Sequence, residues 1–284
     1  MRKNLPILTL LLAGLLTACG EQPTSEPMSQ NDAQNLKYTF LQSNPFFIAS
    51  LGNPAGLLNT AGTQGLPEPI ATLGAAMGFD LEPASLACSV NSGGNTQDQD
   101  RDGIPLQASY TADCQQGNNS FKARMSLRDK DDNNPKSGYV LDTQEFQLVL
   151  YKGQSTETGL ILDLDLDLTQ HNSNYSLYHN FNLTLYNRSN RYNLAYTYTT
   201  TYTPDDPQNP FYAGTINFSG IFDYRYNRKW YRLNALGIDL KYSRTCTQSF
   251  IGGRVRLEDS QSNRLEIVYN GCNNISATYN GQVL

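Results

Sequence analysis

Apolar and polar residues alternate with a period of two along most of the chain after Leu86. The clearest case is residues 162–168, in which four leucines alternate with Asp163, Asp165 and Asp167. Strict alternation over such lengths predicts antiparallel strands with one buried face and one solvated face. The same pattern, with aromatic and aliphatic side chains on one face, recurs over residues 121–127, 175–185, 192–202, 216–226 and 236–242.

Short polar segments such as "HNSN", "NRSN" and "PDDPQNP" separate these strands. About eleven strands joined mainly by short turns predict a meander. Long consecutive strands with one apolar face curl into a barrel or half-barrel. The predicted fold is therefore mainly β, a long-stranded antiparallel meander over residues 88–284. A transmembrane β-barrel ranks lower, because lipid would penalise outer-face charges such as Asp163, Arg188 and Arg225.

Residues 36–87 lack this alternation and are apolar and small, with frequent glycine and proline. Asn44-Pro45 and Asn53-Pro54 each place a capping residue before a proline, and Gly52 and Gly78 are suited to close a helix. These signals predict a short apolar helical segment, with helices over residues 45–50, 54–60 and 67–77. Each is too short to be stable alone, so they must pack on another element. A loosely ordered apolar arm is the alternative.

The N-terminus reads MRKNLPILTLLLAGLLTACG, a basic start followed by an apolar run too short to span a membrane. Leu16-Thr17-Ala18-Cys19 resembles the lipobox of bacterial lipoproteins. The resemblance implies that residues 1–18 are a signal peptide, that Cys19 carries lipid, and that the protein is anchored in the cell envelope. Gly20 in place of aspartate favours the outer membrane or cell surface. The polar residues 19–35 are expected to form a flexible tether.

Charge and composition limit the partners of the mature chain. Without Arg2 and Lys3 it has 19 basic residues against 26 acidic ones, so binding to nucleic acid is not expected. Twelve of the 18 tyrosines lie between Tyr175 and Tyr242. They suit half-buried strands, or alternatively a surface that binds glycan or protein. The membrane is reached through the lipid anchor and not by a span.

Four cysteines remain once Cys19 is assigned to lipid, an even number in an exported protein, which predicts two disulfides. Of three possible connectivities we favour Cys88–Cys114 and Cys246–Cys272. Each pair is 26 residues apart and brackets a predicted hairpin. A zinc site is the rival interpretation, but the chain has no C-x2-C pair and only two histidines.

The segment "DQDRDGIP" resembles the start of a calcium-binding loop. Asp98, Asp100 and Asp102 occupy ligand positions 1, 3 and 5, Gly103 permits the sharp turn, and the carbonyl of Ile104 would be the seventh ligand. The segment resembles the loops of thrombospondin type 3 repeats. It departs from the EF-hand pattern because position 12 is Ser109 and not glutamate, so the predicted calcium affinity is weak and the role structural.

A second acidic segment is expected to join this loop. If Cys88 pairs with Cys114 across a hairpin, an antiparallel return strand brings Asp129, Asp131 and Asp132 to the same end as the aspartate loop. A cation would relieve the repulsion between so many carboxylates, and Asp129 and Asp131 are predicted to assist in binding it. The alternative is a solvated acidic turn whose charges Arg101, Arg128 and Lys130 balance.

No local motif indicates catalysis, so no catalytic residue is assigned and an enzyme is not expected. The row Asp163, Asp165 and Asp167 is interpreted as a solvated strand face, and His179 as a buried histidine. The favoured function is a lipid-anchored envelope protein with a non-enzymatic binding or structural role, whose partner is a glycan, a lipid or an envelope protein. The alternatives are a carrier of a hydrophobic ligand, with the helical segment as a lid, and a glycan-acting enzyme.

Overall fold

The computed structural model describes residues 25–52, 87–152, 156–171, 173–187, 191–210, 212–226, 228–246 and 250–284. In this part of the chain one helix precedes a thirteen-stranded antiparallel sheet whose strands pair in sequence order. The elements are α2 (Gln30–Gly52), β1 (Ala87–Gly93), β2 (Ala108–Gln116), β3 (Asn119–Asp129), β4 (Tyr139–Lys152), β5 (Thr156–His171), β6 (Asn174–Asn187), β7 (Arg191–Pro204), β8 (Ala213–Tyr226), β9 (Lys229–Ser243), β10 (Gly252–Glu258), β11 (Arg264–Tyr269), β12 (Ile275–Tyr279) and β13 (Gln282–Val283).

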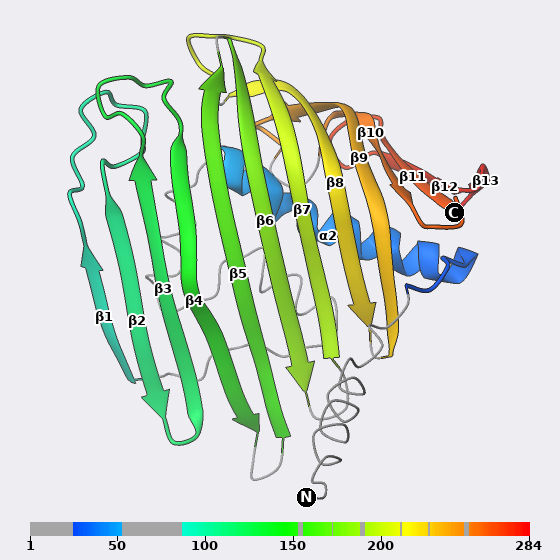
Figure 1. The fold of residues 1–284 in the computed structure, drawn as a ribbon, viewed down its shortest axis with the longest axis horizontal. Coiled ribbons are helices and arrows are strands. Elements are labelled where there is room, and N and C mark those ends of the chain that lie inside the picture. Colours follow the sequence, from blue (N-terminus) through cyan, green and yellow to red (C-terminus); the bar gives the residue numbers. More distant parts are fainter. Residues whose placement is uncertain are drawn as a thin grey trace, which may run out of the picture.

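The sheet is an open meander, which confirms the predicted mainly β class. Each strand pairs only with its neighbours in sequence, and β1 and β13 are its two ends. Figure 1 shows that the sheet curves, with β9 to β13 folding round toward the side on which α2 lies. Of the two predicted shapes, the open one is therefore found and a closed barrel is not.

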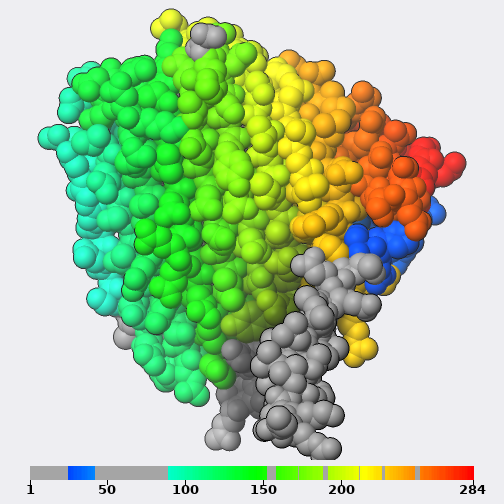
Figure 2. Space-filling model, viewed as in Figure 1, coloured from blue at the N-terminus to red at the C-terminus, as the bar shows by residue number. Residues whose placement is uncertain are grey.

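The alternating sequence pattern places the core on one face of the sheet. In β5 the four leucines are buried, whereas Asp163 and Asp167 between them are exposed. A row of stacked rings crosses the buried face from Phe181 through Tyr196 and Tyr198 to Phe218, with centroids 4.5–4.7 Å apart. The opposite, polar face is continuous in Figure 2, in which α2 is visible only beside β10–β13. Burying these side chains is the main stabilising contribution to the fold.

α2 begins earlier than the sequence pattern suggested. Residues 19–35 were expected to be a tether, but the helix starts at Gln30, and Met28, Ala33 and Leu36 are buried. The local cause is a capping interaction: Ser29 Oγ accepts from Asp32 N–H, and the Asp32 carboxylate accepts from Ser29 N–H, both at 3.2 Å. The carboxylate of Asp259 in the β10–β11 turn then accepts from Met28 N–H at 2.6 Å, which fixes the segment to the sheet.

Two further expectations concern the helical segment. A new helix was expected at Pro45, but α2 runs through this residue and ends at Gly52, the predicted closing glycine. The helix packs on the sheet, as the ring contact between Phe40 and Phe222 shows, with centroids 5.5 Å apart. The expected helices at 54–60 and 67–77, and Gly78, lie outside the described residues. α2, the helix in the described part of the chain, is not long and apolar enough to cross a membrane.

The disulfide Cys246–Cys272 is present, as predicted, with its Cα atoms 5.8 Å apart. It brackets the β10–β11 hairpin. Cys114 is also disulfide-bonded, and the register of β1 with β2 places it directly opposite Cys88, whose side chain lies outside the described residues. Cys19 also falls outside them.

Candidate functional site: a two-loop aspartate cluster

Two loops meet at one end of the N-terminal part of the sheet. The first, residues 94–107, connects β1 to β2, and the second, residues 130–138, connects β3 to β4. β2 pairs with β3 starting at Ala108 opposite Leu127, so the two loops lie at the same end of the sheet. Hydrogen bonds then join them, from Gln99 N–H to Asp132 Oδ1 at 2.9 Å and from Asp129 N–H to the Pro105 carbonyl. The hairpin geometry predicted from the sequence is therefore present.

The aspartate loop is wound tightly by hydrogen bonds from its own backbone. Asp100 accepts from Asp102 N–H at 3.2 Å, Asp102 accepts from Ile104 N–H at 2.7 Å, and Asp98 accepts from Gly103 N–H at 3.1 Å. Gly103 has a φ of 88°, a left-handed conformation that glycine adopts at little cost. These hydrogen bonds hold one oxygen of each of the three carboxylates against the backbone of the loop.

The end of β3 and the second loop present carboxylates from a more buried position. Asp129 is 2% exposed and Asp132 is 4% exposed. Asp129 Oδ1 accepts from Ser137 Oγ at 2.8 Å and from Asp131 N–H, and Asp132 Oδ1 accepts from Gln99 N–H. Neither carboxylate can move far, because each is held by the backbone of one of the two loops.

Four of these carboxylates keep one oxygen without a hydrogen-bond partner. In each case the other oxygen makes the contacts just described, and the unpartnered oxygen is itself buried from solvent. A buried carboxylate oxygen with no partner is costly, so it indicates a missing ligand such as a water or a cation. The atoms are Asp98 Oδ1, Asp100 Oδ2, Asp129 Oδ2 and Asp132 Oδ2.

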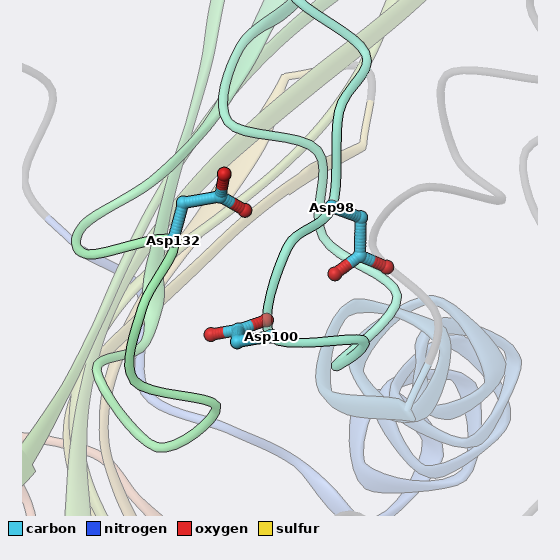
Figure 3. A group of neighbouring side chains, drawn as sticks. All are labelled: Asp98, Asp100 and Asp132. Atoms are coloured by element: carbon cyan, nitrogen blue, oxygen red, sulfur yellow. The ribbon is translucent and has the colours of Figure 1, made fainter.

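Carboxylate oxygens from both loops converge in two groups. One consists of Asp98, Asp100 and Asp132, and the other of Asp100, Asp102 and Asp129, each with its ligand atoms within 4.8 Å of one another. Figure 3 shows the first group, with Asp98 and Asp100 on one loop facing Asp132 on the other across a common space. These acidic groups can hold a metal ion.

The electrostatics of the cluster also favour a bound cation. Burial raises the pKa of Asp102 to about 7, and the nearby charges of Asp100, Asp129 and Asp98 add to this rise. Burial likewise raises the pKa of Asp100, with further contributions from Asp129 and Asp98. Carboxylates that resist ionisation in this way are ionised more easily when a cation offsets the repulsion.

The basic side chains near the loops do not provide that cation. Lys130 pairs with Asp167 on β5 and also contacts Thr169. In the part of the chain that the structure describes, no ion pair connects Arg101, Arg128 or Lys130 to an aspartate of either group. In the alternative interpretation these three residues balance the charge of a solvated acidic turn. No ion pair in the described part of the chain supports it.

The predicted ligand set and the observed groups differ at two aspartates. Asp132 belongs to the first group but was not among the predicted ligands. Asp131 is exposed, accepts from Asn133 N–H and is in neither group. The Ile104 carbonyl stays a predicted ligand, on a residue whose side chain is buried in the core and whose N–H donates to Asp102. Sequence alternation could not reveal which neighbour of a pair such as Asp131-Asp132 faces inward in a loop.

Two other features singled out in the sequence have no part in the cluster. His179 is fully buried on the inner face, with its ring 4.9 Å from that of Tyr196, as expected of a histidine on the apolar side of a strand. Asp163 and Asp167 lie on the solvated face. Comparison of the chain with family models, with curated proteins and with solved structures finds no match.

Proposed function

We propose that the protein is a lipid-anchored cell-envelope protein with a binding or structural role, in which calcium stabilises one end of an open β-sheet. The observation that carries the calcium assignment is a set of four aspartates that each bury one carboxylate oxygen without a partner and whose carboxylates group together from two parts of the chain. The ligand atoms are all oxygens, which suits a hard cation such as calcium better than zinc.

The proposed location rests on the N-terminal sequence and on the cysteines. The lipobox ending at Cys19 supports export and lipidation, and the disulfide Cys246–Cys272 fits an oxidising compartment. Sites of this kind in extracellular modules bind calcium with a Kd of about 10⁻⁴–10⁻³ M. Such an affinity suffices wherever calcium is abundant, so the ion would be a permanent structural component and not a signal.

The ion would act near one edge of the sheet. β1 is the terminal strand, and the side chains from Ser89 to Gly93 are exposed. β1 carries no charged residue or proline to discourage pairing with another chain. A cation between the β1–β2 loop and the β3–β4 loop would hold this edge in place against β3 and β4.

The adjacent residues Asp131 and Asp132 provide a matched test. Calcium at about 1–5 mM should raise the melting temperature of the wild-type protein, because it binds the folded state. Asp132→Asn should reduce this rise, whereas Asp131→Asn should retain it in full. Asp131 is the adjacent residue and lies outside both groups. Differential scanning calorimetry measures both shifts. Equal rises in the two variants, or no rise in the wild type, would refute the proposal.

A carrier of a hydrophobic ligand is the second candidate, and the position of α2 favours it. The helix lies across the inner face of the curved sheet, where it contacts Phe222 and the strands β11 and β12. That face also buries the hydroxyls of Tyr196, Tyr198 and Thr200 without hydrogen-bond partners. Lipid extracted from the purified protein and detected by mass spectrometry would favour this role. A lipid-free protein that takes up no fatty acid from vesicles would exclude it.

A further inference from the structure

The aspartate cluster divides into two sets of ligands that share one residue. Each set combines two aspartates of the β1–β2 loop with one buried aspartate from the end of β3 or from the loop that follows it. Asp98 and Asp132 belong to one set, Asp102 and Asp129 to the other, and Asp100 belongs to both. We propose that the site holds two calcium ions bridged by the Asp100 carboxylate, an inference that rests on the calcium site proposed above.

The spacing within each set fits one ion. Calcium binds oxygen at about 2.3–2.6 Å, so the ligands of a single ion lie at most about 5 Å from one another. The ligand atoms within each set meet this limit, since they lie within 4.8 Å of each other. Asp100 is the only residue that meets it in both sets among the described residues. Two metal ions bridged in this manner are typically about 3.5–4 Å apart.

Each set has its own buried and unsatisfied anchor. Asp132 Oδ2 in the first set and Asp129 Oδ2 in the second have no hydrogen-bond partner, although both residues are more than nine-tenths buried. If one ion were bound between Asp98, Asp100 and Asp132, the Asp129 oxygen would still lack a partner. A second ion supplies it.

The charge of the cluster leads to the same conclusion. The two sets together contain five aspartates, which one calcium ion would leave with a net charge of −3 and two ions with −1. Excess negative charge is costly where carboxylates are removed from solvent. Lys130 is already paired with Asp167, and a second cation would reduce the remaining charge at the cluster.

Native mass spectrometry of the full mature chain, titrated with calcium chloride, counts the bound ions. The wild type should bind two, and Asp131→Asn should also bind two. Asp98→Asn and Asp102→Asn should each retain one, because each removes a ligand from a single set. Asp100→Asn should lose both at a concentration that saturates the wild type, with binding weakened by about tenfold or more.

The outcomes separate this inference from the proposed function. One ion bound to the wild type would overturn the two-ion site and leave a single calcium site standing. No bound ion would overturn both. The wild-type count needs no variant to fold, and near-ultraviolet circular dichroism of each variant shows whether a lost ion reflects a lost ligand or a lost fold. Equal losses in Asp98→Asn and Asp100→Asn, with a folded spectrum, would also contradict bridging.

Discussion

Four of the five aspartates of the cluster use their two oxygens differently. One oxygen accepts a backbone N–H and fixes the loop, and the other is buried without a hydrogen-bond partner. The sequence indicates that the first loop supplies metal ligands, because Asp98, Asp100, Asp102 and Gly103 have the spacing of a calcium loop. It does not reveal Asp132, whose participation depends on the register of β2 with β3 and on the path of the turn that follows.

The buried imidazole of His179 should make stability depend on pH. Burial lowers its pKa from 6.5 to about 3, so the folded protein keeps the imidazole neutral while the unfolded chain protonates it. The stability that neutral His179 contributes is therefore complete above pH 6.5 and is lost as the pH falls toward 3. Between pH 6.5 and pH 4 the loss should be about 3 kcal/mol.

His179→Phe should remove that loss, because phenylalanine occupies the same apolar site and does not titrate. Urea unfolding of both proteins from pH 7 to pH 4 measures the difference, and the carboxylates titrate equally in each. The wild type should lose stability more steeply than the variant. Parallel curves would show that His179 is not held neutral in the folded protein.

The sequence pattern did not reveal where α2 starts or that it continues past Asn44. The polar composition of residues 19–35 indicated a tether, yet Ser29 and Asp32 form a capping interaction within it. The prolines were interpreted as helix starts, but α2 runs through Pro45. The long strands were predictable because alternation over ten or more residues is a strong signal, whereas β13 has only two residues.

Asp259 should be essential for docking of this N-terminal segment. Its burial would raise its pKa, but hydrogen bonds from Met28 N–H, from the Asn263 side chain and from backbone N–H groups lower it. Asp259→Ala leaves those donors without an acceptor and should cost about 2–3 kcal/mol of folding free energy. Amide hydrogen exchange should accelerate over residues 26–41.

The exposed Asp206 in the β7–β8 turn is the matched control. It also accepts from nearby donors, Gln208 N–H and the Asn209 side chain, but these lie within its own loop. Asp206→Ala should leave exchange over residues 26–41 unchanged. If Asp259→Ala accelerates exchange only in the β10–β11 hairpin, then Asp259 stabilises its own turn and does not dock the helix.

At the scale of the whole molecule, the protein is an open sheet with one apolar face, one polar face and two different ends. One end is β1 beside the aspartate cluster, and the other is the short β13. Alternation in the sequence predicts the two faces, but an open meander and a closed barrel have the same alternation. Whether the ends meet depends on strand tilt and stagger, which no local pattern encodes.

The lipid anchor is a prediction for the whole molecule in its cell. Leu16-Thr17-Ala18-Cys19 predicts that the mature protein starts at Cys19 and carries two or three acyl chains. The intact mass of membrane-extracted protein should show this addition, and Cys19→Ala should leave the membrane fraction. A Cys19→Ala protein that still fractionates with membranes would contradict the anchor.

If calcium links the two loops at the β1 end of the sheet, the ion should be visible by diffraction. Crystals grown with calcium, and measured at a wavelength that enhances its anomalous scattering, should give an anomalous difference peak enclosed by Asp98, Asp100 and Asp132. The peak should be absent from crystals of Asp132→Asn grown under the same conditions. A well-ordered wild-type cluster with only water between the carboxylates would contradict the calcium link.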